Sequence, residues 1–150
     1  MKIIIDTNVA LSGLLWGSPP NQILKWGRDR VIRILACEKT VDELKRVLQY
    51  SKSSNRLSVL QSSPQQAMAY FLNLVSFVPD PESIPNIIKR DPSDNLFLAL
   101  AEQNGAAMIV SGDRHLLDLE SFGNIQIVTP SEGVQIIMSL LIKNNEIAPF

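Results

Sequence analysis

The stretch Lys2-Ile3-Ile4-Ile5-Asp6-Thr7-Asn8 places three consecutive isoleucines directly before an acidic residue. Such a run, without alternating polar positions, is typical of a strand that is buried on both faces in a parallel sheet. A second apolar run, 107–110, ends in the same way at Ser111-Gly112-Asp113. Because parallel strands end along one edge of their sheet, where ligand sites form, we expect Asp6 and Asp113 to approach each other in space.

Two further acids accompany predicted helices. Glu43 lies near the start of a helix predicted over 40–50, and Asp94 lies in Asp91-Pro92-Ser93-Asp94-Asn95, which begins another helix. Carboxylate oxygens are the ligands that Mg²⁺ and Mn²⁺ prefer, and these ions support phosphate-ester chemistry. The pattern indicates a candidate metal site whose members are Asp6, Glu43, Asp94 and Asp113.

Strands and helices are expected to alternate along the whole chain. Strands are predicted over 2–6, 31–36, 77–78, 107–110 and 125–128, and helices over 9–16, 21–28, 40–50, 63–75, 91–104, 115–119 and 129–142, while 51–58 is ambiguous between loop and frayed helix. This alternation predicts an α/β fold, a three-layer α/β/α sandwich with a mainly parallel sheet. We expect one domain over residues 1–142 and a C-terminal tail over 143–150.

Composition narrows the possible protein classes. The 150 residues are 45% hydrophobic, which is enough for one compact core. The longest apolar run, 136–142, is too short to span a bilayer, and Asp6 interrupts the N-terminal run that a secretory signal would need. The single cysteine, Cys37, excludes an internal disulfide. We therefore expect a cytoplasmic protein with no membrane association.

Net charge does not decide whether the chain binds RNA. It is −1 at pH 7 and becomes +3 when four site carboxylates are set aside. Dinucleotide-binding, P-loop, α/β-hydrolase and zincin motifs are absent from the sequence. The only histidine, His115, excludes a histidine-rich zinc site, and we interpret it as a turn residue. Helical spacing predicts core positions for the aromatic residues Trp16, Trp26, Phe71 and Phe97.

Each acid also has a purely structural interpretation. Asp6 and Asp113 could cap the helices that follow them, and Glu43 could close a capping box with Thr40. Asp94 is different because Asp91 is the natural cap before Pro92. Asp94 then falls on the helix face whose later positions are apolar, which favours a functional role.

Taken together, these motifs resemble those of PIN-domain ribonucleases, specifically the small stand-alone VapC-like toxins of toxin–antitoxin pairs. The resemblance covers Met1 to about Leu141. It rests on Ile4-Ile5-Asp6-Thr7-Asn8, Thr40-Val41-Asp42-Glu43-Leu44, Arg90-Asp91-Pro92-Ser93-Asp94-Asn95 with Leu98-Ala99-Leu100-Ala101, and Ser111-Gly112-Asp113-Arg114-His115-Leu116-Leu117.

The resemblance implies a five-stranded parallel sheet between helices and a metal-dependent endoribonuclease. Asp6, Glu43, Asp94 and Asp113 would hold one or two Mg²⁺ or Mn²⁺ ions, with Asn8, Asp91 and Ser111 as supporting residues. A metal-activated water would cleave the RNA phosphodiester bond. The resemblance also implies a homodimer and an antitoxin protein that covers the acidic pocket.

Two other interpretations remain open at this point. The first is a PIN-like module that binds RNA or protein with weak or no catalysis. The second is another α/β domain, such as an aspartate-nucleophile phosphotransferase or a receiver domain. Asn8 stands where such a phosphotransferase needs its second aspartate, and no lysine follows the run 125–128 until Lys143, which disfavours the receiver domain.

Overall fold

A computed structural model describes residues 1–144 of the chain. Within these residues one sheet of six strands has the order β3-β2-β1-β4-β6-β5. The strands are β1 (Lys2–Ile5), β2 (Arg33–Ala36), β3 (Val75–Phe77), β4 (Met108–Val110), β5 (Ser121–Phe122) and β6 (Ile125–Val128). All neighbouring pairs are parallel except β5 with β6, which is antiparallel. The predicted five-stranded sheet is thus present, with β5 added at one edge.

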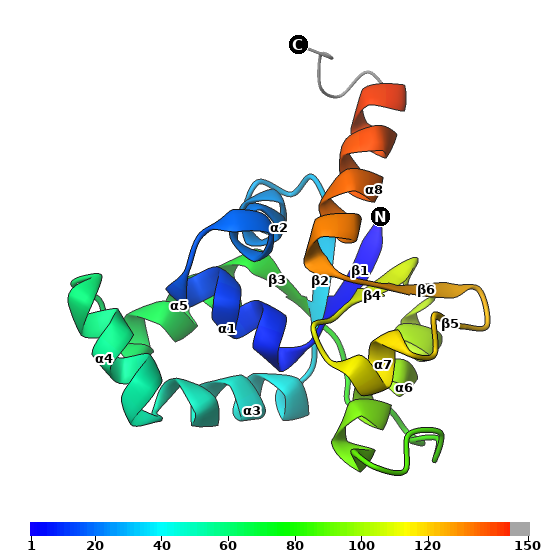
Figure 1. Cartoon of the computed structure of the whole chain (residues 1–150), viewed down its shortest axis with the longest axis horizontal. Coiled ribbons are helices and arrows are strands. Elements are labelled where there is room, and N and C mark those ends of the chain that lie inside the picture. The colour runs from blue at the N-terminus through cyan, green and yellow to red at the C-terminus, as the bar shows by residue number, and fades with distance from the viewer. Residues whose placement is uncertain (145–150) are drawn as a thin grey trace.

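Helices cover both faces of this sheet (Figure 1). They are α1 (Thr7–Leu15), α2 (Ser18–Arg28), α3 (Glu38–Leu48), α4 (Ser51–Val59), α5 (Pro64–Leu74), α6 (Asn95–Asn104), α7 (Arg114–Leu117) and α8 (Pro130–Lys143), with a 3₁₀ turn, η1 (Pro92–Asp94), directly before α6. One buried cluster joins the sheet to α1–α5 and α8, and a second joins it to α6 and α7. The predicted three-layer α/β/α sandwich is therefore confirmed.

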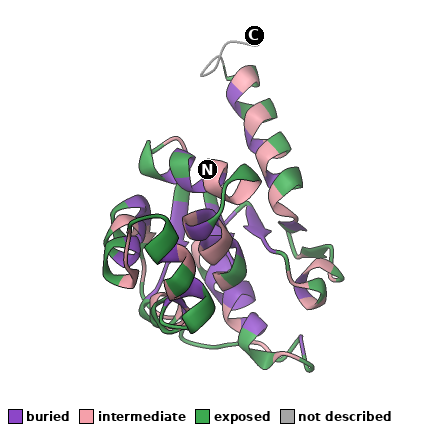
Figure 2. Cartoon of the chain, turned by 60° about the vertical axis from the view of Figure 1, so that its left-hand side comes forward, coloured by how far each residue is buried: buried purple, intermediate pink, exposed green. Residues whose placement is uncertain are grey.

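The isoleucine run of β1 explains why the sheet has two cores. Ile3 and Ile5 belong to the cluster beneath α1, whereas Ile4 belongs to the cluster beneath α6. Ile3 and Ile4 are fully buried and Ile5 is 6% exposed. Since side chains along a strand alternate between faces, three apolar residues in a row require apolar layers on both sides. Figure 2 shows this central buried strand region between partly exposed helices.

The start of α3 differs from the prediction and changes how Glu43 is interpreted. The helix begins at Glu38 rather than Thr40, with Cys37 as its N-cap. The backbone amide of Cys37 donates to Thr40 Oγ1 at 3.0 Å. Thr40 is therefore the third residue of the first helical turn, and its side chain caps the helix start at Cys37. The predicted capping box between Thr40 and Glu43 was wrong, and capping does not explain Glu43.

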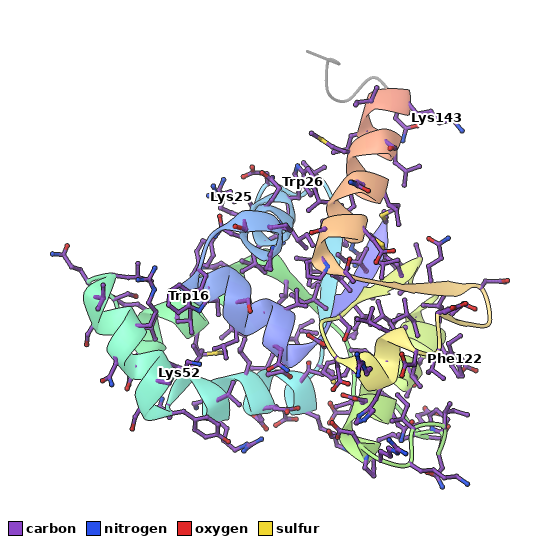
Figure 3. All side chains as sticks on the ribbon, viewed as in Figure 1. Trp16, Lys25, Trp26, Lys52, Phe122 and Lys143 are labelled. Atoms are coloured by element: carbon purple, nitrogen blue, oxygen red, sulfur yellow. The ribbon has the colours of Figure 1, made fainter. Side chains whose placement is uncertain are left out.

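Two other segments also depart from expectation. Residues 51–58, which were ambiguous, lie in α4. Trp16 was predicted in the core but is 51% exposed, with the guanidinium of Arg56 4.1 Å from its ring centroid. Figure 3 shows Trp16 at the end of α1 beside α4. The other three aromatic residues, Trp26, Phe71 and Phe97, are buried as predicted.

The C-terminal helix α8 projects at the top of Figure 1 and packs Ile137 and Leu141 into the larger buried cluster. Its base is held by a capping box between Thr129 and Glu132. The predicted boundary at residue 142 falls inside the last turn of α8, and residues 145–150 of the predicted tail lie outside the described residues. None of the helices in residues 1–144 combines the length and apolar character that crossing a membrane requires.

Candidate metal centre

Asp6 leaves β1 at the edge of the sheet where β4 also ends. Ile5 pairs with Val110 in the parallel register, so Asp6 and Ser111 follow in neighbouring strands. Asp6 Oδ1 accepts a hydrogen bond from the Val9 amide at 2.8 Å and caps α1. Its Oδ2 accepts from the Ser111 hydroxyl and from the Gly112 amide, the latter at 3.3 Å. The capping interpretation of Asp6 is therefore confirmed, and its second oxygen ties β1 to the loop after β4.

The same hydroxyl connects Asp6 to Asp113. Ser111 is fully buried, and its Oγ accepts a hydrogen bond from the Asp113 amide at 2.9 Å while donating to Asp6. Asp113 Oδ1 accepts from the His115 amide at 2.8 Å and caps α7. One serine thus fixes the relative positions of two acids that are 107 residues apart in the sequence.

Asp94 reaches this edge of the sheet from the 3₁₀ turn before α6. It is 6% exposed, and its Oδ2 has no hydrogen-bond partner among the residues that the structure describes. Asp91 precedes the turn and accepts a hydrogen bond from the Ser93 hydroxyl at 2.5 Å. A buried carboxylate oxygen without a partner is unusual, because leaving it unsatisfied costs about 1–3 kcal/mol or more.

Asn95 holds the loop that carries Asp91. Its Oδ1 accepts from the amides of Ile87 and Ile88, and its Nδ2 donates to the Ile88 carbonyl at 2.9 Å. Asn95 is 2% exposed, and its two bonds with Ile88 are buried. Sequence reasoning assigned no role to this residue. Its side chain binds a loop without regular structure, which no helix or strand period could reveal.

Four side chains come together at this point. Asp91, Asp94, Asp113 and His115 each offer one ligand atom, and these four atoms all lie within 4.8 Å of one another. His115 Nδ1 lies 3.6 Å from Asp113 Oδ1 and is buried, with no hydrogen-bond partner in the described part of the chain. Three of these residues were expected at the site, whereas His115 had been interpreted as a turn residue. His115 lies two residues after Asp113, in the helical turn that Asp113 caps. This spacing in the sequence could have indicated that His115 lies close to the site.

Burial and mutual repulsion make this group electrostatically unfavourable without a cation. Burial is the largest cause that raises the pKa of Asp94, to about 8, and the neighbouring carboxylates of Asp113, Asp91 and Asp6 add to it. Burial also raises the pKa of Asp6, although its hydrogen bonds to Ser111, Val9 and Gly112 oppose the change. Desolvation and nearby like charge both disfavour the ionised carboxylate. A divalent cation at this position would reverse both effects.

The donor set fits such a cation. Asp94 Oδ2 is buried and unpartnered among the described residues. Asp91 and Asp113 supply two further carboxylates, and His115 supplies an imidazole nitrogen, all within 4.8 Å of one another. Hard divalent ions take carboxylate oxygens as ligands, and divalent transition ions also take imidazole nitrogen. The residues present can therefore hold one divalent metal ion.

Two predicted site residues lie apart from this group. Glu43, on α3, is half-buried, and its Oε1 lies 3.8 Å from Arg46 Nη2. Asn8 is exposed on the first turn of α1. Among the described residues, the four-residue group includes neither Glu43 nor Asp6, and Asp6 is linked to it through Ser111.

Comparison with known proteins gives one match. The family model described as PIN domain matches residues 2–115, a segment that contains Asp6, Asp94, Asp113 and His115. No curated protein and no solved structure gives a significant match to the chain.

Proposed function

The chain belongs to the PIN-domain family, and we propose on this premise that it is a metal-dependent endoribonuclease that cleaves RNA phosphodiester bonds. PIN domains are generally metal-dependent nucleases, and the acidic group at the edge of the sheet fits that chemistry. The proposal rests on one observation: Oδ2 of Asp94 is buried among other carboxylates without a hydrogen-bond partner in residues 1–144. Such an arrangement is stable only when a cation or protons compensate the charge.

The acids have distinct proposed tasks. Asp94 and Asp113 would hold the Mg²⁺ or Mn²⁺ ion, and Asp91 would add a third carboxylate from the same four-residue group. Asp6 would position Asp113 through the shared Ser111 hydroxyl, and it remains a proposed ligand of the ion. Glu43 is the fourth proposed acid, and its Oε1 lies 3.8 Å from Arg46 Nη2.

When bound, the divalent cation supplies a water of lowered pKa and neutralises charge on the phosphate. The protein then has to hold the acids ionised and fixed. The backbone amides of Val9 and Gly112 donate to Asp6 and favour its ionised form. Exposed cations beside the acids in sequence, Lys89, Arg90 and Arg114, offer positive charge to the RNA backbone.

RNA cleavage tests this proposal with a matched pair of variants. We expect wild type to cleave single-stranded or structured RNA with Mn²⁺ or Mg²⁺, and Asp94→Asn to lose at least about 100-fold in rate because it removes a charged ligand. Asp118→Asn changes an exposed aspartate beyond α7 and should cleave like wild type. Equal cleavage by Asp94→Asn and wild type would place the activity elsewhere or in a contaminant. Metal-dependent binding of RNA without cleavage would favour a binding module instead.

We propose further that the enzyme is the cytoplasmic toxin of a toxin–antitoxin pair and forms a homodimer. The support is the resemblance of its four acidic motifs to those of small VapC-like toxins. Induced expression should then arrest growth, and co-expression of an antitoxin encoded next to its gene should restore it. Growth arrest that persists in Asp94→Asn, or normal growth on induction of an active nuclease, would refute the toxin role.

A further inference from the structure

We propose that His115 is a ligand of the metal ion through Nδ1, and that this nitrogen makes the site prefer Mn²⁺ to Mg²⁺. The inference rests on the proposed metal-dependent function and adds a ligand and a selectivity to it. Among residues 1–144, His115 Nδ1 is buried without a hydrogen-bond partner, and the nearest carboxylate oxygen, Asp113 Oδ1, lies 3.6 Å away. That separation is too long for a hydrogen bond.

A structural role does not account for this side chain. His115 contributes to the cap of α7 through its backbone amide, which donates to Asp113 Oδ1 at 2.8 Å, and any residue could supply that amide. The side chain is 39% exposed, so core packing does not explain it either. The Nδ1 atom is nevertheless buried, 3.6 Å from Asp113 Oδ1, and a ring nitrogen of His115 lies within 4.8 Å of carboxylate oxygens from Asp91, Asp94 and Asp113. Nitrogen and carboxylate oxygen lone pairs facing one another require a proton or a cation between them.

The spacing of the four ligand atoms suits one ion. An octahedral ion with bonds of about 2.1 Å holds its ligands about 3 Å apart when adjacent and about 4.2 Å apart when opposite. The atoms of Asp91, Asp94, Asp113 and His115 all lie within 4.8 Å of one another, so small side-chain rotations bring them to this geometry. Asp94, 6% exposed with Oδ2 unpartnered, is the second, independent sign that a cation belongs here.

Ligand type then determines the preferred ion. Three carboxylates alone would suit Mg²⁺ and Mn²⁺ alike, whereas an imidazole nitrogen favours the transition ion. We expect wild type to bind Mn²⁺ at least about 10-fold more tightly than Mg²⁺. His115→Asn replaces the nitrogen with an amide oxygen at a similar distance from the backbone, and it should reduce that preference mainly by weakening Mn²⁺ binding.

Electron spin-echo envelope modulation on the Mn²⁺-loaded protein tests the ligand directly. The chain contains one histidine, so in tag-free protein an imidazole-type ¹⁴N coupling can come only from His115. We expect the coupling in wild type and in the Asp118→Asn control, and its loss in His115→Asn. Calorimetric titration of the same samples with Mn²⁺ and with Mg²⁺ gives the affinity ratio.

The outcomes separate this inference from the function on which it rests. Stoichiometric Mn²⁺ binding without imidazole coupling would overturn His115 as a ligand while leaving the metal-dependent function intact. An unchanged ratio of Mn²⁺ to Mg²⁺ affinity in His115→Asn would overturn the selectivity. Absence of any Mn²⁺ binding to folded wild type would overturn both the inference and the proposed function.

Discussion

Replacing Asp94 by asparagine should stabilise the metal-free protein at alkaline pH. Asparagine has nearly the same shape but no charge, so it removes the repulsion among Asp94, Asp113, Asp91 and Asp6 that accompanies burial. A carboxyl whose pKa is raised in the folded state destabilises that state above its unfolded pKa. The stability that the protonated Asp94 carboxyl contributes to the metal-free wild type is therefore fully present below about pH 4. It is lost as the pH rises towards the folded pKa of Asp94, about 8.

The size of the effect follows from the pKa. Asp94 changes from an ordinary value of 3.8 to about 8. At about 1.4 kcal/mol per unit, this difference of about four units sets a ceiling near 6 kcal/mol. Relaxation of the side chain and entry of water reduce such penalties, and we expect about 2 kcal/mol. For a chain of this size, that corresponds to about 4–8 °C in Tm.

Thermal unfolding in EDTA, followed by circular dichroism between about pH 5 and pH 8.5, measures this effect. The Tm advantage of Asp94→Asn should be small near pH 5 and should grow with pH, while Asp118→Asn follows wild type throughout. A saturating excess of Mn²⁺, about 100 times its Kd, should add about 2.7 kcal/mol to wild type and much less to the variant. An Asp94→Asn protein that melts at or below the wild-type Tm at alkaline pH would show that the carboxylates do not repel as described.

Three further substitutions test the supports of the site. Ser111→Ala removes the hydroxyl that joins Asp6 to Asp113, and we expect a loss of about 1–3 kcal/mol in urea unfolding; an unchanged midpoint would mean that the link is not formed. Asn95→Ala frees the loop at Ile87 and Ile88, and it should speed hydrogen exchange of those two amides and weaken Mn²⁺ binding. Gly112→Ala should leave Tm within about 2 °C, because a Cβ there meets no atom within 4 Å; a large drop in Tm would contradict this geometry.

The elements that could be predicted from the sequence are those whose structure local composition determines. The isoleucines of β1 could be placed in a doubly covered strand because burial on both faces leaves no polar position. The helix predicted to end at residue 104 does end there, and Gly105 follows as its C-cap with a φ of 63°. The two-residue strand β5 was missed because it has no period of its own and depends on pairing with β6.

The site was harder to predict because its members meet through tertiary structure. The approach of Asp6 to Asp113 followed from the order of parallel strands, and the convergence of Asp94 with Asp113 is present in the structure. The contribution of His115 depends on how a single helical turn directs one ring edge, which no spacing rule provides. The role of Glu43 rests on family resemblance, since its carboxylate lies beside Arg46.

The proposed function requires the carboxylates of Asp94 and Asp113 to bind one divalent metal ion together. An anomalous difference map from crystals grown with Mn²⁺, collected at the manganese absorption edge, would locate that ion. We expect one strong peak within about 2.3 Å of oxygens from both aspartates, with His115 Nδ1 at a similar distance. A well-ordered site without an anomalous peak, or a peak bound only by other residues, would contradict it.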